Sequence, residues 1–195
     1  MPGRRSTTSP SRSRQVAVDA LRLPSDREVS PGVLRMLERL TEVPAYVQNV
    51  RYDVLARNTL AAKLIGDLGS ERNLLRPAFG SRTAQVSCGG PDGEAQFVRQ
   101  AVAELRGAAV RYPNDPRIPE LIAWLSTRDI NFQNDWAARE VAPTATIWKR
   151  FVHPDVGMIE LDAQTLSVPG TDQRIVIYTA EPESSAAKAL HELTA

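Results

Sequence analysis

The chain has 195 residues, of which 42% are hydrophobic and 24% charged, and this length suits one domain with a well-buried core. A formal net charge of +1 excludes the domain-wide positive field with which a free-standing nucleic-acid-binding protein collects phosphates. A single cysteine, Cys88, excludes an internal disulfide framework and a thiolate zinc cage, and it fits a reducing cytoplasm.

The N-terminal segment MPGRRSTTSPSRSR is rich in Ser, Thr, Pro and Arg, and it has no apolar period. We therefore expect residues 1–29 to form a disordered basic arm and linker, either as a solvated tail or as an arm that touches a phosphate backbone. No apolar run of secretory or membrane-spanning length follows. The chain is expected to be soluble and cytoplasmic, without a membrane partner.

Residues 30–195 are expected to form one domain, and its first third predicts a helix, a hairpin and a second helix. SPGVLRMLERL begins with a good N-cap and a proline and has one apolar face. PAYVQNVRYDVLARN alternates with a period of two, which predicts a β-hairpin with Asn49 as a left-handed turn residue. TLAAKLIGDLG predicts a helix that is capped by Asn58 and ends at Gly69.

The middle of the chain predicts mainly helices. SERNLLRPAF is a short helical piece, and GSRTAQVSCGGPDG reads as a loop because of its glycines and proline. Apolar residues recur at helical spacing from about Glu94 to Arg111. Asp115 and Pro116 cap a further helix that is expected to continue to Trp136.

The last third returns to strands. TATIWKRF, VGMIEL and QRIVIYT are rich in β-formers and are separated by turn residues, and SSAAKALHEL closes the chain as a helix. The order of two strands, a helical block and three strands predicts an α+β fold. We expect a five-stranded antiparallel sheet that helices cover on one face, with a concave space between them for a small ligand.

Six phrases occur in a familiar order between residues 30 and 193: SPGVLRMLERL, PAYVQNVRYDVLARN, ERNLLR, YPNDPRIPELIAWLS, KRFVHPDVGMIELD and QRIVIYTAEPESSAAKAL. Together they resemble the MmyB-like ligand-binding domain, the PAS-like C-terminal half of Xre-family helix-turn-helix regulators that are common in actinobacteria. The resemblance implies a PAS-like domain that senses a small, fatty-acid-like molecule and assists dimerisation, while a separate helix-turn-helix reads DNA.

The chain departs from the family pattern in several places. Fewer than thirty residues precede the domain and show no paired amphipathic helices, so the helix-turn-helix is expected to be absent, which puts direct DNA contact in doubt. Arg57 replaces the tryptophan of VLAWN, Glu183 replaces the glycine of EPGS, and GSRTAQVSCGGPDGE replaces an acidic and aromatic stretch. These departures leave open an altered ligand preference or the loss of binding.

The expected ligand-binding residues form an apolar wall and a polar head. An ordinary core role is the alternative for the wall, and surface charge or helix capping is the alternative for most of the head. His153, which precedes Pro154, either shapes the HPDVG turn or contacts the ligand head. The wall comprises Tyr46, Phe97, Leu105, Leu125, Phe151 and Tyr178, and the head comprises Asn58, Arg72, Asn73, Arg150 and His153.

The sequence offers no GxSxG, no HExxH and no glycine-rich loop that ends in GK[ST], and its second histidine is His191 on the terminal helix. We therefore expect no catalysis, no metal and no cofactor. The leading hypothesis is a ligand-sensing domain of a transcriptional regulator, which forms a homodimer or pairs with related regulators. The alternative is a protein-interaction module without DNA contact that modulates related regulators.

Overall fold

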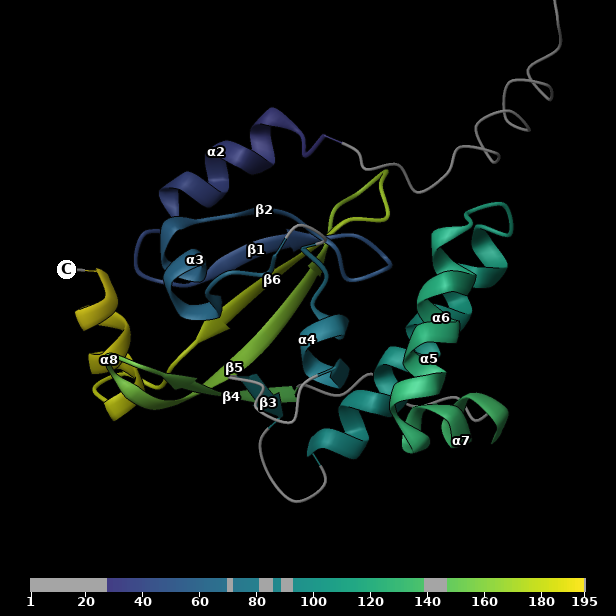
Figure 1. The fold of residues 1–195 in the computed structure, drawn as a ribbon. Coiled ribbons are helices and arrows are strands. Elements are labelled where there is room, and N and C mark those ends of the chain that lie inside the picture. The colour runs from purple at the N-terminus through teal and green to yellow at the C-terminus, as the bar shows by residue number, and fades with distance from the viewer. Residues whose placement is uncertain (1–27, 70–71, 81–85, 89–92, 139–146, 195) are drawn as a thin grey trace, which may run out of the picture.

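The computed structural model describes residues 28–69, 72–80, 86–88, 93–138 and 147–194 (Figure 1). Nearly all of the expected N-terminal arm lies outside these ranges. The described residues form an α+β fold with one curved antiparallel sheet, whose strands follow the order β2-β1-β6-β5-β4-β3. The strands are β1 (Ala45–Gln48), β2 (Val54–Arg57), β3 (Val86–Cys88), β4 (Ile147–His153), β5 (Gly157–Ser167) and β6 (Arg174–Thr179).

The five expected strands are present in the expected antiparallel arrangement, which confirms the fold class. The structure adds β3, which lies in a segment that the sequence predicts to be a loop. β3 pairs with β4 over three residues at the edge of the sheet, from Val86 opposite Phe151 to Cys88 opposite Lys149. Three residues among glycines are too few to show a period of two, so the pairing has no sequence signature.

Seven helices surround the sheet in the described residues. They are α2 (Pro31–Arg39), α3 (Thr59–Ile65), α4 (Leu75–Gly80), α5 (Gly93–Arg111), α6 (Arg117–Arg128), α7 (Ile130–Ala138) and α8 (Ser185–Thr194). Two expected boundaries are wrong. Helix α3 ends at Gly66, which has a φ of 73°, and not at Gly69. The helix expected to reach Trp136 breaks at Asp129, whose extended backbone ends α6 and whose Oδ1 accepts a hydrogen bond from Phe132 N at 2.8 Å.

The β1–β2 turn also differs from its prediction. Asn49 is not in the left-handed region; its Oδ1 instead accepts hydrogen bonds from the backbone N–H groups of Arg51 (2.9 Å) and Asp53 (3.0 Å). The left-handed residue is Tyr52, with a φ of 65°. A bulky aromatic residue rarely adopts this conformation, so the surrounding contacts must hold Tyr52 in place.

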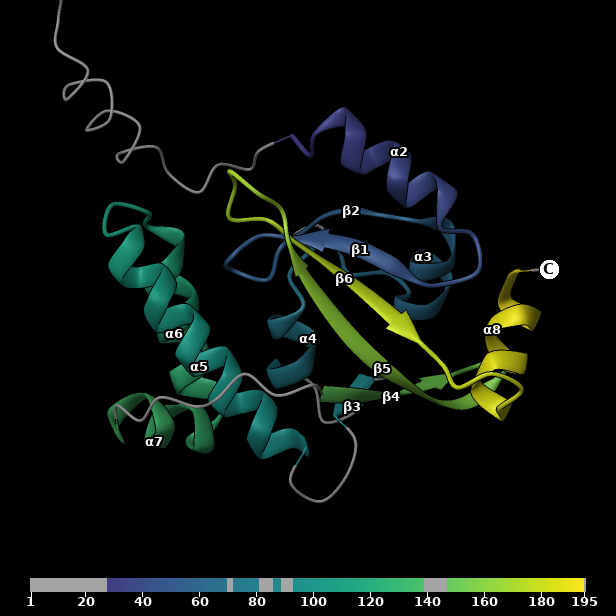
Figure 2. The ribbon, with the colours of Figure 1, turned by 180° about the vertical axis from the view of Figure 1, so that it is seen from behind.

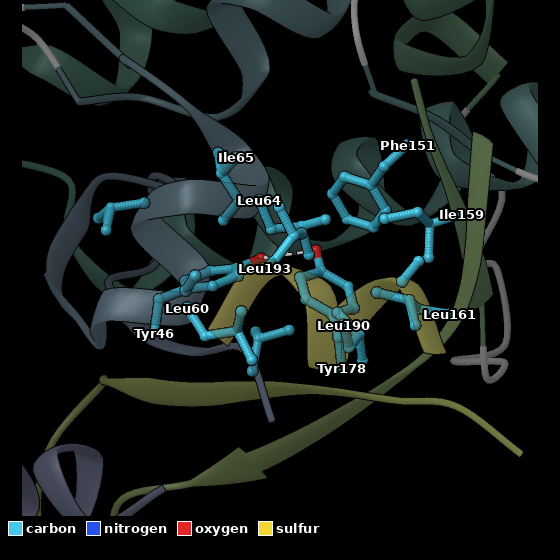
Figure 3. Packing of buried hydrophobic residues seen from close by; sticks show 14 residues of the cluster. Tyr46, Leu60, Leu64, Ile65, Phe151, Ile159, Leu161, Tyr178, Leu190 and Leu193 are labelled. Atoms are coloured by element: carbon cyan, nitrogen blue, oxygen red, sulfur yellow. Dashed lines mark hydrogen bonds between the residues drawn. The ribbon is translucent and has the colours of Figure 1, made fainter. Parts of the chain in front are cut away.

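The first core cluster, here called the sheet cluster, lies between the sheet and helices α3 and α8. Figure 3 shows leucines of both helices pointing toward aromatic and aliphatic side chains of the strands. The hydroxyl groups of Tyr46 and Tyr178 meet there at 3.3 Å. The buried members are Tyr46, Val54, Leu60, Ala61, Leu64, Ile65, Phe151, Ile159, Leu161, Val176, Tyr178, Ala189, Leu190 and Leu193.

Helix α2 packs on the opposite face of the sheet, in addition to the cover expected on one face (Figures 1 and 2). Its Leu37 contacts a small cluster with Ala45 and Val47 of β1 and Ile175 of β6. Because successive strand residues point to opposite faces, β1 buries both its faces. Among the described residues, no helix covers the outer face of β4 and β5, and Trp148, Val152 and Met158 are exposed there.

The remaining helices form a block beside the sheet, at the end remote from α8 in both views (Figures 1 and 2). Its core, here called the helical cluster, has as buried members Tyr52, Leu75, Val98, Ala101, Val102, Leu105, Leu121, Leu125 and Phe132. Two tryptophans lie at its margin. Trp124 is flanked by the guanidinium groups of Arg76 and Arg128, and Trp136 stacks on Phe132.

Candidate ligand-binding site

A buried ion-pair network fixes the β1–β2 turn against the helical block. Arg51 is only 2% exposed, and its guanidinium pairs with Asp115 at 2.6 Å and with Asp53 at 2.8 Å. Asn73 donates hydrogen bonds to Arg51 O and Asp53 Oδ1, both at 2.7 Å. The turn, the start of α4 and the start of α6 are therefore joined by charge-assisted bonds in a desolvated place.

Next to this network, two polar side chains share the inner face of the sheet. Gln48 of β1 and Arg174 of β6 are directly opposite each other in the ladder, so their side chains point to the same side. Arg174 reaches α5, where its Nη1 pairs with Glu104 Oε2 at 2.5 Å. Gln100, one turn earlier on α5, donates to the other Glu104 oxygen at 3.0 Å.

Tyr52 completes the group. Its ring lies edge-on to Phe97, with the ring centres 6.4 Å apart, and the Arg174 guanidinium lies 5.5 Å from its ring centre. Burial, and then the neighbouring Glu104 carboxylate, raise the pKa of Tyr52 well above its usual range. The strained backbone of Tyr52 thus holds a neutral phenol inside the protein.

Three polar atoms of this group are buried without a hydrogen-bond partner among the described residues: Gln48 Oε1, Tyr52 Oη and Arg174 Nε. The fourth member of the group, Glu104 Oε2, has the Arg174 guanidinium as its ion-pair partner. The residues Gln48, Tyr52, Glu104 and Arg174 are called the inner polar cluster below. Each unmet buried group costs about 1–3 kcal/mol, and native proteins rarely leave several together. This concentration of unmet groups marks the inner polar cluster as the candidate site.

Aromatic side chains adjoin the inner polar cluster on the sheet and on α5. Tyr46 lies two residues before Gln48 on the same face of β1, and burial raises the pKa of Tyr46 to about 12. The Lys149 Nζ sits 3.8 Å from the ring centre of Phe97, at the boundary between β4 and α5. The arrangement places apolar side chains next to polar groups, as the linings of small-molecule sites do.

Comparison with protein-family models shows which family the chain belongs to. The model of the MmyB-like transcription regulator ligand binding domain matches residues 29–193. The chain belongs to this family. Ligand binding in a transcription regulator is therefore the role of the MmyB-like domain. No curated protein matches the chain.

Two further findings concern the described residues of the MmyB-like domain. None of their helices combines the length and apolar character that crossing a bilayer requires. Within the same residues, no three His, Cys, Asp or Glu side chains group together so that they could hold a metal ion.

The six expected wall residues separate into two places. Tyr46, Phe151 and Tyr178 are buried in the sheet cluster, where the Phe151 and Tyr178 rings meet edge-on at 5.1 Å. Leu105 and Leu125 are fully buried in the helical cluster, and Phe97 packs against it. Of the six, Tyr46 and Phe97 stand nearest to the inner polar cluster by the contacts given above.

The side chains of two expected head residues form hydrogen bonds with backbone groups. The Asn58 Oδ1 accepts from Ala61 N and Ala45 N, and its Nδ2 donates to two carbonyls, Leu40 O and Val43 O. This agrees with the N-cap prediction for Asn58. Asn73 belongs to the ion-pair network, and its Oδ1 accepts from Leu75 N at 3.0 Å, as the capping alternative predicts.

The other three expected head residues lie apart from one another. Arg72 is exposed, with a φ of 49°, and its carbonyl accepts from Val54 N. Arg150 forms an ion pair with Glu160 across the outer face of β4 and β5 at 2.7 Å, which matches the surface-charge alternative. The five head residues are not brought together into one site.

His153 ends β4 and braces the turn that follows. Its Nε2 lies 3.1 Å from Lys63 O of α3, and its Nδ1 accepts a hydrogen bond from Asp155 N at 3.2 Å. The turn closes at Gly157, with a φ of 75°. These contacts agree with the turn-shaping alternative for His153.

None of the residues of the inner polar cluster is singled out by a sequence motif. A usable signal exists for two of them. Gln48 and Arg174 occupy inward-facing positions of strands whose same-face neighbours, Tyr46 and Val176, are apolar. A polar residue in that register is unexpected in a core strand. Tyr52 and Glu104 join the cluster only through the tertiary fold.

The departures from the family pattern have local consequences. Arg57, in place of tryptophan, donates through Nη1 to Gly66 O at 2.6 Å, at the C-terminus of α3. Glu183, in place of glycine, has a φ of 62°, which glycine adopts without strain. Most of the replaced stretch between residues 80 and 94 lies outside the described residues.

Proposed function

We propose that this MmyB-like domain senses a small apolar, fatty-acid-like molecule in the cytoplasm and thereby modulates transcription. The apolar chain would lie along the aromatic side chains between the sheet and α5, and the polar end would meet the inner polar cluster. The observation that carries the proposal is the set of unpartnered buried atoms of Gln48, Tyr52 and Arg174 beside Tyr46 and Phe97. The family match supports the regulatory role.

The apolar chain and the polar end of such a ligand contribute differently to its binding free energy. Each methylene removed from water contributes about 0.8 kcal/mol, so a medium-length chain supplies the larger part of the affinity. A hydrogen bond to a charged group contributes about 1.5–3 kcal/mol and fixes which end lies where. Affinity should therefore rise with chain length until the apolar surface is used up.

The test is a binding series on the full chain. Saturated alcohols, acids and amides of eight to fourteen carbons are titrated by calorimetry, after native mass spectrometry has established what co-purifies. We expect the dissociation constant to fall about fourfold for each added methylene. Arg174→Met should weaken binding of every compound, and the matched control Arg111→Met, whose side chain is 63% exposed, should not. A series in which no compound binds contradicts the proposal.

A second candidate function rests on the outer face of β4 and β5, which none of the described helices covers. Val152 and Met158 are directly opposite each other there, 57% and 64% exposed. Arg150 and Glu160 lie beside them with opposite charges. In a two-fold interface, residue i of one copy contacts residue j of the other and j contacts i, so a patch that carries both an arginine and a glutamate can pair with itself, while residues at the axis meet their own copies. We propose a second copy of this chain as its occupant.

Sedimentation of the full chain tests this pairing. Met158→Glu should shift a dimer to the monomer, because it places like charges at the apolar centre of the interface. The control Val110→Glu changes a residue that is 84% exposed on α5 and should leave the mass unchanged. A wild-type chain that sediments as a monomer at the highest accessible concentration excludes this interface.

A further inference from the structure

The unmet atoms of the inner polar cluster define a hydrogen-bond inventory. Gln48 Oε1 can only accept, Arg174 Nε can only donate, and Tyr52 Oη can do either, whereas Glu104 Oε2 is already paired with Arg174 Nη1. Both Gln48 and Tyr52 are more than nine-tenths buried. A ligand group that satisfies this set must carry a donor as well as an acceptor.

The charge balance of the cluster points the same way. Arg174 is the cation of the cluster, and Glu104 already neutralises it at 2.5 Å. An ionised carboxylate placed against Arg174 Nε would stand next to the Glu104 carboxylate. Like charges in a desolvated place repel strongly, and a carboxylate also has no proton to donate to Gln48 Oε1.

We propose that the inner polar cluster selects an uncharged end group that both donates and accepts hydrogen bonds, such as a primary amide, over the carboxylate of the same chain. This inference rests on the proposed function, because it names the ligand class of that same site. An amide fits the inventory: its two N–H groups match Gln48 Oε1 and Tyr52 Oη, and its carbonyl matches Arg174 Nε. An alcohol offers one donor, and an ester offers none.

The first measurement needs no variant. Decanamide, decan-1-ol, methyl decanoate and decanoate are titrated into the full wild-type chain at about pH 8, where the acid is ionised. The amide should bind most tightly, the alcohol less tightly, and the ester and the carboxylate at least about tenfold more weakly than the amide. The shared chain keeps the apolar contribution the same, so the ratios report the end group alone.

The second measurement reverses the charge balance. Glu104→Gln keeps the shape of the side chain and leaves the Arg174 charge without its partner. The ratio of decanoate to decanamide dissociation constants should fall by about tenfold or more in this variant. The matched control Glu160→Gln removes a carboxylate from the outer-face pair with Arg150 and should leave the ratio as in the wild type.

The outcomes separate the two proposals. If decanoate binds the wild type as tightly as decanamide, the end-group inference is wrong while the proposed function stands. A ratio that Glu104→Gln does not change, in a variant that binds the amide, also overturns the inference. If none of the four compounds binds, the proposed function itself fails.

Discussion

Replacing Asp115 with asparagine removes one charge from the buried network that joins the β1–β2 turn to the helical block. The Asp115 side chain is 1% exposed, and its Oδ2 lies 2.6 Å from Arg51 Nη1. Its Oδ1 also accepts from Arg117 N at 3.0 Å at the start of α6. In Asp115→Asn, Arg51 keeps Asp53 as a partner but loses its more deeply buried one.

The size of the effect follows from burial. Removing one partner of a buried pair costs about 3–5 kcal/mol, because the remaining charge has lost its water as well as its partner. Asparagine keeps an oxygen that can still accept from Arg117 N, which favours the lower end. We expect the free energy of unfolding to fall by about 3 kcal/mol, and Tm to fall by about 6–12 °C for a domain of this size.

Urea denaturation followed by circular dichroism measures the change, with the wild type and Asp172→Asn in parallel. Asp172 pairs with Arg111 at 2.9 Å, but the Arg111 side chain is 63% exposed, so this control should cost less than about 1 kcal/mol. The reasoning is refuted if Asp115→Asn costs no more than Asp172→Asn.

Three further predictions concern local features. Asn58→Ala should lower the free energy of unfolding by about 2 kcal/mol or more in urea titrations, because four backbone groups lose their hydrogen-bond partner. The control Asn131→Ala, on the exposed side of α7, should change it by less than about 0.5 kcal/mol. Glu183→Gly should raise Tm by relieving a left-handed residue worth about 1 kcal/mol, while Glu181→Gly, at an ordinary φ, should not raise it. The raised pKa of Tyr46 means that its neutral form stabilises the fold fully below pH 10; this contribution, roughly 3 kcal/mol, should be lost as the pH rises from 10 to 12. Tyr46→Phe should flatten that decline, and equal declines in both proteins would contradict the assignment.

Local signals in the sequence were sufficient for most elements. Ser30 and Asn58 predict helix starts, because an N-cap side chain bonds to a backbone N–H only three residues later and the signal is therefore local. Alternation predicts the β1–β2 hairpin, and β-forming residues predict β4, β5 and β6, whereas β3 has no sequence signature. Predicted helix boundaries were wrong where two local structures suit the same residues. The apolar spacing continues past Asp129, but the extended backbone of Asp129 ends the helix.

The candidate site was less accessible from the sequence, for a physical reason. Helical and strand periods indicate which side chains point inward, but not which of them meet. Leu105 and Phe151 were both expected in one wall, yet they belong to different core clusters. The Arg174–Glu104 pair depends on how α5 lies against β6, which no local pattern encodes.

The placement of the three tryptophans gives this domain built-in optical probes. Trp124 and Trp136 lie in the helical block, and Trp148 lies on the outer face of β4, while the sheet cluster itself contains tyrosine but no tryptophan among its described members. Emission from the indoles therefore reports chiefly on the helices, whereas Tyr46 and Tyr178 lie in the sheet cluster. A molecule that moves α5 away from the sheet would change indole emission while the sheet cluster stays intact, whereas cooperative melting of the whole domain would disrupt both clusters together.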